Sequence, residues 1–446
     1  MLTAIVAAAL LQALWLEPPA SVPLDREDLD GFAYDIAGAP DLDGDAFEDL
    51  LVADPDPRLD ADARGGFWVV SGRTGARIAH VEGPAGRGWF GVSVGWLGTR
   101  SAGEKPAFAV GDVASYPIDS LFEDRNQGQT GVVHLVTIDG EELGRIANDP
   151  PRKRFGRSIV ATADLDGDGA RDLVLPVGSP KPDGVLGSIR VRSGRSLREI
   201  HPIAAAVPSI DFESNVVVTS NAIPDFGHLL ACASAHDGIF LRRTVQLHRL
   251  AAKTSLHLQI EGRQGEADFG DCVADLGDLD GDGWPEIGVG IPMRYGPSVR
   301  GADERGAVRI FSSRTGAVLR DVRCPRERYR FGAAIAVRAA RAGEDGPVLI
   351  VASAPRVESS APGDTPELYE FSARTWEPIR VRSLEGRGGQ RLVVLRGTDG
   401  SQRIATSRCD CDTSGAPGAV TIFSDDPSVS PLIVTRATLT AHNSVK

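Results

Sequence analysis

The feature that most constrains the fold of this chain is an acidic motif that occurs three times. Its copies read DLDGDAFED from Asp41, DLDGDGARD from Asp164 and DLDGDGWPE from Asp278, and each continues into a short apolar segment. Each copy begins nine residues after a phenylalanine, namely Phe32, Phe155 and Phe269. Because the spacing upstream of the motif is constant, whole units of the chain repeat rather than the motif alone.

Units without the acidic residues lie between the acidic copies. Segments 89–112 and 330–355 keep the Phe-Gly pair and the apolar strands, whereas 212–262 and 386–437 follow the pattern more loosely. The acidic units also share a turn of hairpin type, which reads SGRTG (71–75), SGRS (193–196) and SSRTG (312–316). We therefore divide the chain into seven repeats of about 60 residues, which cover 31–84, 86–149, 152–203, 212–262, 265–325, 326–384 and 386–437.

Each repeat predicts four short strands, which in the first repeat cover approximately 31–39, 49–53, 66–71 and 76–81. No segment after the N-terminus has helical periodicity. Sheets of four strands that repeat around an axis bury each other's faces and leave no long open edge. We therefore expect an all-β fold, a seven-bladed β-propeller of four-stranded antiparallel blades over 21–437, with 438–446 as a tail. A linear β-solenoid is the competing fold, but its coils are normally much shorter than about 60 residues.

The acidic loops have the ligand spacing of a calcium site. Oxygen atoms at positions 1, 3, 5, 7 and 9, the seventh a backbone carbonyl, converge when the backbone coils tightly around glycine. These positions are Asp41, Asp43, Asp45, Phe47 and Asp49 in the first loop, Asp164, Asp166, Asp168, Ala170 and Asp172 in the second, and Asp278, Asp280, Asp282, Trp284 and Glu286 in the third. Carboxylates this close repel one another unless a cation lies between them. We therefore predict about three bound Ca²⁺ ions.

Other interpretations of these loops are less consistent with the sequence. An EF-hand continues into a helix with Glu at position 12, but here a strand follows and position 12 is Val52, Leu175 or Val289. Magnesium prefers rigid octahedral sites rich in water, so calcium fits better. A merely solvated acidic turn is the remaining alternative. It applies best to the first loop, where Ala46 replaces glycine at position 6 and would strain the turn.

These motifs resemble the FG-GAP repeat family, which includes the seven-bladed propeller of the integrin alpha-subunit head and its bacterial relatives. The matching elements are the calcium loops, the Phe-Gly pairs at 90–91, 155–156, 269–270 and 331–332, and the strand ends at 354–355 and 291–292. The resemblance covers nearly the whole chain after its N-terminus. The chain departs from the family pattern at Ala33, which follows Phe32, and in the fourth and seventh repeats, which have no clear Phe-Gly pair. We expect the resemblance to describe the propeller and not a membrane receptor.

The resemblance implies a binding module rather than an enzyme. It places the calcium loops on one face, so the long loops 54–65, 112–131, 292–306 and 355–366 would lie on the other, where propellers commonly bind partners. Tyr116, Phe122 and Arg125 are the first candidates for contact with a protein or glycan ligand. The alternative function is a Ca-dependent polysaccharide lyase or hydrolase with a site in the central channel. GVSVG (91–95) matches a nucleophile-elbow pattern around Ser93, but it lacks the strand-turn-helix setting that such an elbow needs.

Composition and the N-terminus restrict the cellular setting. A formal net charge of -13 argues against a nucleic-acid partner, because phosphate binding needs clustered basic residues. An apolar run at 2–16 precedes Ala20, so 1–20 is predicted to be a signal peptide of a secreted or envelope-exposed protein. An uncleaved anchor and a misassigned start are the alternatives, and no other segment could span a bilayer. The five cysteines do not decide the redox compartment; Cys409 and Cys411 are read as loop residues or as partners for Cys324.

Overall fold

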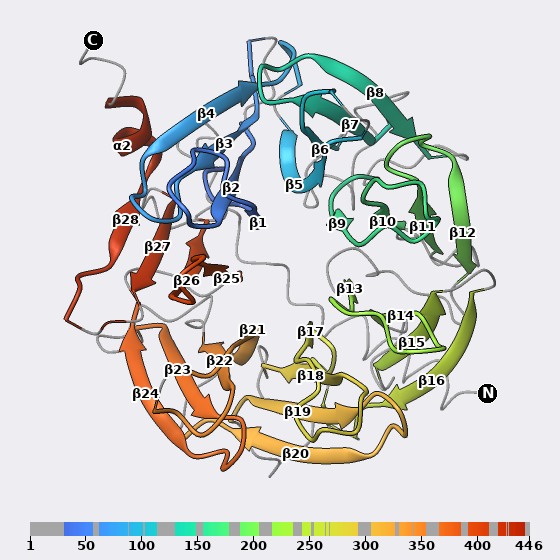
Figure 1. The fold of residues 1–446 in the computed structure, drawn as a ribbon, viewed down its shortest axis with the longest axis vertical. Helices are drawn as coiled ribbons and strands as arrows, with labels where there is room; N and C mark the ends of the chain where they lie inside the picture. The colour runs from blue at the N-terminus through green and yellow to red at the C-terminus, as the bar shows by residue number, and fades with distance from the viewer. Residues whose placement is uncertain are drawn as a thin grey trace, which may run out of the picture.

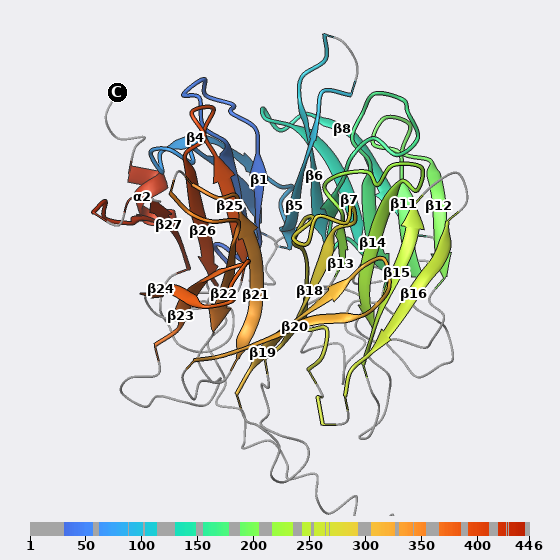
Figure 2. The same cartoon turned by 60° about the horizontal axis from the view of Figure 1, so that its bottom comes forward.

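The structure is a computed structural model that describes residues 31–56, 62–87, 89–100, 103–113, 130–148, 155–177, 188–204, 216–234, 243–250, 254–263, 265–266, 268–292, 305–325, 330–341, 343–353, 365–384, 391–409, 418–424, 426 and 428–441. The described strands form seven four-stranded antiparallel sheets that surround a common axis (Figure 1). Figure 2 shows the ring tilted, with the strands of each blade running between its two faces. The prediction of a seven-bladed propeller is confirmed.

Each blade, numbered in chain order, is built from four consecutive strands. Their bounds are, in blade 1, β1 (Ile36–Ala39), β2 (Asp49–Asp54), β3 (Gly66–Val70) and β4 (Arg77–Glu82); in blade 2, β5 (Phe90–Gly98), β6 (Ala107–Asp112), β7 (Val132–Thr137) and β8 (Glu142–Ala147); in blade 3, β9 (Val160–Ala161), β10 (Leu173–Val177), β11 (Ser188–Arg192) and β12 (Glu199–Ala204); in blade 4, β13 (Val216–Val218), β14 (His228–Ser234), β15 (Thr244–Leu250) and β16 (Ser255–Glu261). The remaining blades contain β17 (Cys272–Asp275), β18 (Glu286–Ile291), β19 (Ala307–Ser312) and β20 (Val318–Arg323); β21 (Phe331–Arg338), β22 (Val348–Ser353), β23 (Glu367–Ser372) and β24 (Pro378–Ser383); and β25 (Leu392–Arg396), β26 (Gln402–Arg408), β27 (Ala419–Ser424) and β28 (Leu432–Val434).

The place of a strand within its blade decides how much of it is buried. The first strand of each blade lies nearest the axis and the fourth lies at the rim (Figure 1). Second strands such as β2 and β22 have a strand on either side and are buried along their whole length. The rim strand β24 instead alternates between exposed and half-buried residues. Blade-on-blade packing therefore explains why second strands are nearly continuous apolar runs in the sequence.

The Phe-Gly pairs join neighbouring blades. Phe90 is 2% exposed and packs in one cluster with Phe67 of blade 1. Gly91 has a φ of +89°, and a Cβ on it would lie 1.9 Å from the carbonyl oxygen of Gly66. Glycine is required there because L-residues disfavour this conformation and because the backbone of blade 1 is too close for a side chain. In the first repeat, Ala33 adopts a similar backbone with a φ of 62°.

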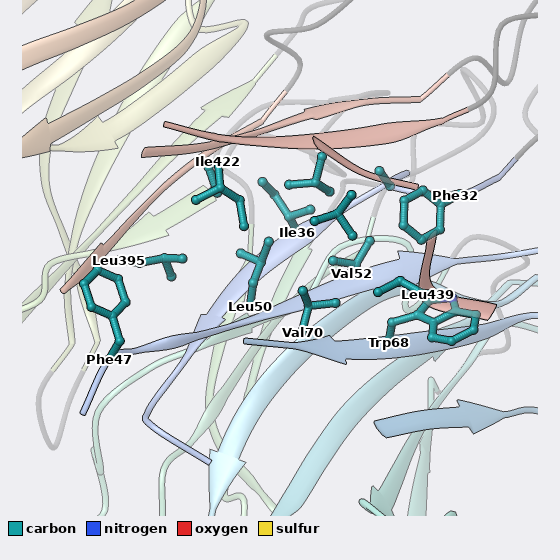
Figure 3. Packing of buried hydrophobic residues seen from close by; sticks show 14 residues of the cluster. Phe32, Ile36, Phe47, Leu50, Val52, Trp68, Val70, Leu395, Ile422 and Leu439 are labelled. Carbon is teal, nitrogen blue, oxygen red and sulfur yellow. The ribbon is translucent and has the colours of Figure 1, made fainter. Parts of the chain in front are cut away.

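A short C-terminal helix contributes to the contact between the first and last blades. Helix α2 (Arg436–Ala441) follows β28, and its Leu439 is 1% exposed. Figure 3 shows Leu439 near Trp68 of blade 1, in the same cluster as Leu395 of blade 7. The sequence predicted no helix and a tail from 438, so α2 crosses that boundary. A helix of six residues is too short to produce a periodic pattern.

The N-terminal predictions concern a part of the chain that the structure does not describe. The signal peptide at 1–20 lies outside the described residues, as does 21–30. Among the described residues, no helix has the length and apolar character needed to cross a membrane.

Candidate metal centres

The three acidic loops occupy equivalent places in the ring, between the first and second strands of blades 1, 3 and 5. In each loop the structure brings three carboxylates together, so that one oxygen of each lies within 4.8 Å of the others. The groups are Asp41, Asp43 and Asp45 in the first loop, Asp164, Asp166 and Asp172 in the second, and Asp278, Asp280 and Asp282 in the third. Three of the predicted carboxylate ligands therefore lie together in each loop, while Asp49, Asp168 and Glu286 are not part of these groups.

Backbone amides hold each loop in a tight coil around its first aspartate. In the first loop, the amides of Gly44 and Ala46 donate to Asp41 Oδ1 and Oδ2 at 2.6 and 2.8 Å. The amide of Asp45 donates to Asp43 Oδ1 at 3.2 Å. The corresponding bonds recur from Gly167 and Gly169 to Asp164, and from Gly281 and Gly283 to Asp278. These bonds come from the local sequence, because donor and acceptor are at most five residues apart.

The first aspartates of the first and second loops are held in the ionised form. Partial desolvation raises the pKa of Asp41, but the amides of Ala46, Gly44 and Asp45 outweigh it and the net pKa is lowered. The same balance lowers the pKa of Asp164, with Gly169 and Gly167 among the donors. A negative charge is therefore favoured at Asp41 and Asp164.

The ninth position is chemically different because its carboxylates are buried. Asp49, Asp172 and Glu286 are all 0% exposed and begin the second strand or directly precede it. Burial, with the nearby carboxylates of Asp43 and Asp45, raises the pKa of Asp49 to about 6. Burial raises the pKa of Asp172 to about 6 and that of Glu286 to about 7, again with help from acids of the same loop. Ionised carboxylates at these positions need a positive neighbour.

Glu286 has a buried carboxylate oxygen that favours a positively charged neighbour. Its Oε2 accepts a hydrogen bond from the amide of Leu279 at 2.6 Å. No described residue donates a hydrogen bond to its buried Oε1. In the other loops, the corresponding oxygens of Asp49 and Asp172 accept the amides of Gly72 and Gly194 at 3.2 and 3.0 Å. An all-oxygen set of this kind, with one buried carboxylate oxygen left over, fits the preference of Ca²⁺ for hard oxygen ligands.

The seventh residues of the first and third loops pack onto the preceding blade, and that of the second loop is buried. Phe47 is 2% exposed and forms an antiparallel bridge with Gly397 of blade 7. Ala170 is also 2% exposed. Trp284 packs against Phe226 of blade 4, with ring centroids 4.6 Å apart. The apolar side chains at position 7 therefore anchor the loops, while the backbone carbonyl is the predicted ligand.

Residues of the turn between the third and fourth strands support the acidic loops, a role that the sequence reasoning missed. The hydroxyl of Ser71 donates to Asp45 Oδ2 at 3.1 Å, and that of Ser193 donates to Asp168 Oδ2 at 3.0 Å. Arg73 Nη1 donates to the carbonyl oxygen of Asp45 at 2.7 Å. The signal was present in the sequence, because the SGRTG-type turn recurs in the acidic repeats. From the sequence alone, this turn predicts only a hairpin.

In blade 6, an arginine pairs with the carboxylate of the corresponding loop. Glu344 lies thirteen residues after Phe331, as Asp45 does after Phe32. It therefore corresponds to position 5 of the acidic loops. The buried Arg338 guanidinium donates to both Glu344 carboxylate oxygens at 2.6 and 2.7 Å. This bidentate bond is the main reason that the pKa of Glu344 is lowered to about 2. A protein cation therefore balances the carboxylate in this loop.

The innermost strands are mainly small or apolar. They read IAGA in β1, FGVSVGWLG in β5, VA in β9, VVV in β13, CVAD in β17, FGAAIAVR in β21 and LVVLR in β25. The Asp275 carboxylate that ends β17 accepts the backbone amides of Ser220 and Gly277 at 2.8 and 3.0 Å. Ser93, the centre of the elbow-like motif, is 0% exposed and donates to the carbonyl of Gly156 at 2.7 Å. Ser93 is therefore placed as a structural residue.

The predicted partner-binding residues Tyr116, Phe122 and Arg125 lie outside the described residues. Their role in partner binding stays a prediction.

Two curated relatives match part of this sequence. Integrin alpha-5 of Xenopus laevis is 32% identical over 172 residues, which are 37% of this chain and 16% of that protein. Integrin alpha-V of Gallus gallus is 31% identical over 182 residues, which are 38% of this chain and 17% of that protein. This chain is homologous to the propeller region of integrin alpha subunits. The similarity to these integrins spans less than a fifth of either relative's length.

Other comparisons add less about this integrin-like propeller. No protein-family model matches its sequence. Among solved structures, the Dos1 propeller has a TM-score of 0.47 and 11% identity, with 88% of this chain and 77% of that one covered. The WD40 beta propeller domain of Doa1 has a TM-score of 0.47 and 12% identity, with 90% of this chain and 94% of that one covered.

Proposed function

We propose that this chain is a secreted or envelope-exposed propeller that binds about three structural Ca²⁺ ions and acts in adhesion or protein interaction. The observation that carries the calcium assignment is the buried Oε1 of Glu286, to which no described residue donates. It lies at position 9 of a loop whose other carboxylates already converge. A cation supported by all these oxygens would remove the electrostatic cost of the arrangement.

The comparison between blades supports the same proposal. Blade 6 keeps one carboxylate of the motif and balances it with Arg338. The carboxylates of Asp41 and Asp164 instead have backbone amides as their described donors. Amides favour the ionised state of one group, but they do not supply the net positive charge that three convergent carboxylates require. The residues that would hold the ions are the predicted oxygen ligands of the three loops.

A calcium titration of the purified chain tests the assignment. We expect Ca²⁺ to raise the melting temperature above its value in chelator and to give a binding isotherm of about three ions. Asp43→Asn, Asp166→Asn and Asp280→Asn should each remove about one ion, because they are close in shape but remove one charge from one loop. Mg²⁺ at the same concentration is the control ion. An unchanged melting temperature and no detectable binding would mean that the loops are solvated acidic turns.

The proposed location rests on the predicted signal peptide and on one feature of the structure. Cys409 is disulfide-bonded, and disulfides persist mainly in oxidising compartments outside the cytosol. Expression of the full chain and of a chain without residues 1–20, followed by mass spectrometry of the exported fraction, tests this proposal. Export of the full chain alone, beginning near residue 21, is the expected result. Equal retention of both chains inside the cell would overturn it.

The proposed interaction role rests on homology to the integrin alpha propellers. Binding of the calcium-loaded chain to arrayed glycans and to extracellular-matrix proteins tests it, with Tyr116→Ser, Phe122→Ser and Arg125→Ser as variants of the predicted contact loop. We expect binding that these variants weaken without a change in melting temperature. The mainly apolar inner strands do not favour the alternative of a polysaccharide lyase or hydrolase in the channel. Release of unsaturated or reducing sugar ends from an arrayed polysaccharide would reverse that choice.

A further inference from the structure

The seam between blades 7 and 1 is the one junction in the ring where neighbouring blades are not consecutive in the chain. Each described blade uses its own four consecutive strands, so no strand is shared across this seam. Its closure depends on contacts between segments more than 300 residues apart, and the entropy cost of bringing them together is correspondingly large.

The first acidic loop supplies the backbone pairing across the seam. The amide of Glu48 donates to the carbonyl oxygen of Arg396 at 2.8 Å, and the amide of Thr398 donates to that of Ala46 at 3.0 Å. The Glu48 side chain adds a bond, because its Oε2 accepts the amide of Arg396 at 3.0 Å. These contacts make 46–48 a short strand-like extension of the hairpin between β25 and β26.

The turn that supports the first loop is also held by blade 7. Arg403 Nη1 donates to the carbonyl oxygen of Gly72 at 3.1 Å and also bonds that of Arg73. Its guanidinium carbon lies 5.3 Å from the centroid of the Phe47 ring. The fit is close, since a Cβ on Gly72 would lie 2.1 Å from the carbonyl oxygen of Glu48 and 2.8 Å from Leu395 Cδ1. The loop, its supporting turn and blade 7 therefore form one packed unit.

The same arrangement occurs at the other acidic loops, where it does not close the ring. Arg100 of blade 2 donates to the carbonyl of Gly194 at 2.8 Å, in the supporting turn of blade 3. His257 of blade 4 lies with Nε2 3.0 Å from the carbonyl oxygen of Ser313, in the turn of blade 5. Each acidic loop unit thus contacts the preceding blade. In blade 1, the preceding blade is the last one of the chain.

Helix α2 fastens a second part of the seam. Arg436 Nε donates to Asp54 Oδ2 at 3.1 Å, which joins the start of the helix to the end of β2. Leu439 is buried in the cluster shared by blades 1 and 7. This contact contains no acidic loop, so it would remain when the loop is perturbed.

We infer that the first acidic loop is the clasp of the ring, so that a cation bound in it holds blade 7 against blade 1. This inference rests on the proposed calcium function. Without the cation, repulsion among Asp41, Asp43 and Asp45 loosens the loop, and the pairing of 46–48 with 396–398 is lost first. The seam is then the part of the ring that opens, while α2 limits how far the blades separate.

Hydrogen exchange measured by mass spectrometry tests the clasp with a matched pair of variants. Asp43→Asn and Asp166→Asn make the same change at position 3 of the first and second loops, where each carboxylate accepts the amide two residues later at 3.2 Å. In saturating calcium, we expect Asp43→Asn to speed exchange at 392–408 and 46–53 at least tenfold. Asp166→Asn should leave these segments within twofold of the wild type and loosen 164–177 instead.

A second pair keeps the test decisive if an acidic-loop variant fails to fold. Arg403→Met and Arg100→Met each remove one side-chain contact to a supporting turn. Only Arg403→Met should make exchange at 392–408 more sensitive to chelator. The pairing of β14 with β15 in blade 4, a blade without an acidic loop, serves as the internal reference in every sample.

The two proposals fail in different ways. If chelator changes exchange in none of the three acidic loops, the proposal of calcium binding is wrong. The inferred role of the first loop as the clasp is then wrong as well. If chelator speeds exchange in all three loops but 392–408 stays protected in Asp43→Asn and Arg403→Met, calcium binding stands and the clasp is wrong. Faster exchange at 392–408 in both of these variants, with both matched controls unchanged there, supports the clasp.

Discussion

At the scale of single residues, backbone conformation explains where this chain departs from its own repeat. Ala46 has a φ of 68°, and the equivalent Gly169 and Gly283 have φ values of 87° and 85°. The first loop therefore keeps the left-handed turn although it has an alanine there. A left-handed conformation costs an L-residue roughly 1–2 kcal/mol that glycine does not incur.

Replacing this alanine should stabilise the protein. Ala46→Gly should raise the free energy of unfolding by about 1 kcal/mol, because strain at the left-handed position exceeds the entropy that glycine adds to the unfolded chain. Denaturant unfolding in saturating calcium measures the change. Ala37→Gly, within strand β1, is the control and should instead lower stability by about 0.5–1 kcal/mol. A loss of stability in Ala46→Gly would show that the turn is not strained.

A buried histidine should make stability depend on pH. His248 is 5% exposed, and burial lowers its pKa from 6.5 to about 4. Because the unfolded chain binds this proton more readily than the folded chain, the contribution is fully present above pH 6.5. It is lost as pH falls from 6.5 towards 4, at a cost of up to about 3 kcal/mol.

His248→Gln should flatten this part of the pH profile, since glutamine does not titrate. Unfolding free energies between pH 7.5 and 4.5, measured in saturating calcium for both proteins, provide the test. Parallel profiles for the variant and the wild type would show that His248 does not cause the acid sensitivity in this range.

At the scale of structural elements, each acidic loop works together with the supporting turn of its own blade. The loop coils locally, but the carboxylate at its position 5 accepts a hydrogen bond from a hydroxyl about 25 residues later. Asp168 and Ser193 form such a pair. In blade 6, the Arg338 guanidinium pairs with the carboxylate of the corresponding loop. If the proposed calcium sites are correct, the repeat balances its loop carboxylates with an inorganic cation in some blades and with a guanidinium in another.

Removal of the guanidinium should therefore be costly and independent of calcium. Arg338→Met leaves Glu344 and the buried Glu370 without their shared cation and should destabilise the protein by about 3–5 kcal/mol. Thermal melts with and without calcium should show the same loss. Addition of Glu344→Gln to this variant should recover part of the stability, because it removes the carboxylate charge that Arg338 paired with, while Glu370 keeps its contact with Arg382. A melting temperature of Arg338→Met equal to that of the wild type would contradict this role.

At the scale of the whole molecule, the closed ring of blades carries a large negative charge, part of which is concentrated in the three acidic loops. The formal net charge is -13, and the three carboxylate groups lie in equivalent loops of blades 1, 3 and 5. Repulsion within these groups opposes the folded state in chelator and is screened by salt. Calcium would remove the same repulsion locally, so salt and calcium should not act independently.

Salt should therefore stabilise the calcium-free protein more than the calcium-loaded one. Raising sodium chloride from about 20 mM to about 500 mM should increase the melting temperature in chelator by several degrees, since the Debye length falls to about 4 Å, comparable to the separation of up to 4.8 Å between carboxylate oxygens within each loop. In saturating calcium the increase should be at most half as large. Calorimetry under the four conditions measures both effects. Equal salt effects with and without calcium would mean that these loops are not the main source of repulsion.

The sequence by itself determined the repeat, the strand pattern, the fold and the spacing of the acidic loops. These features are local, because the hydrogen bonds that coil each loop join residues at most five positions apart, as from Ala46 to Asp41. Alternation of apolar strands and turns at a constant period was enough to predict the blades, and the structure confirms them.

Only the tertiary structure decided which distant residues complete these loops and close the ring. Three contacts are of this kind: the hydrogen bond from Ser71 to Asp45, the hydrogen bonds from Arg403 to the backbone of 72–73, and the burial of Leu439. They join segments whose separation in sequence carries no periodic signal. Arg338 was not singled out in the sequence, because an arginine at a strand end is ordinary until its carboxylate partners are known. Such contacts depend on how blades pack against one another, and packing is a property of the folded ring.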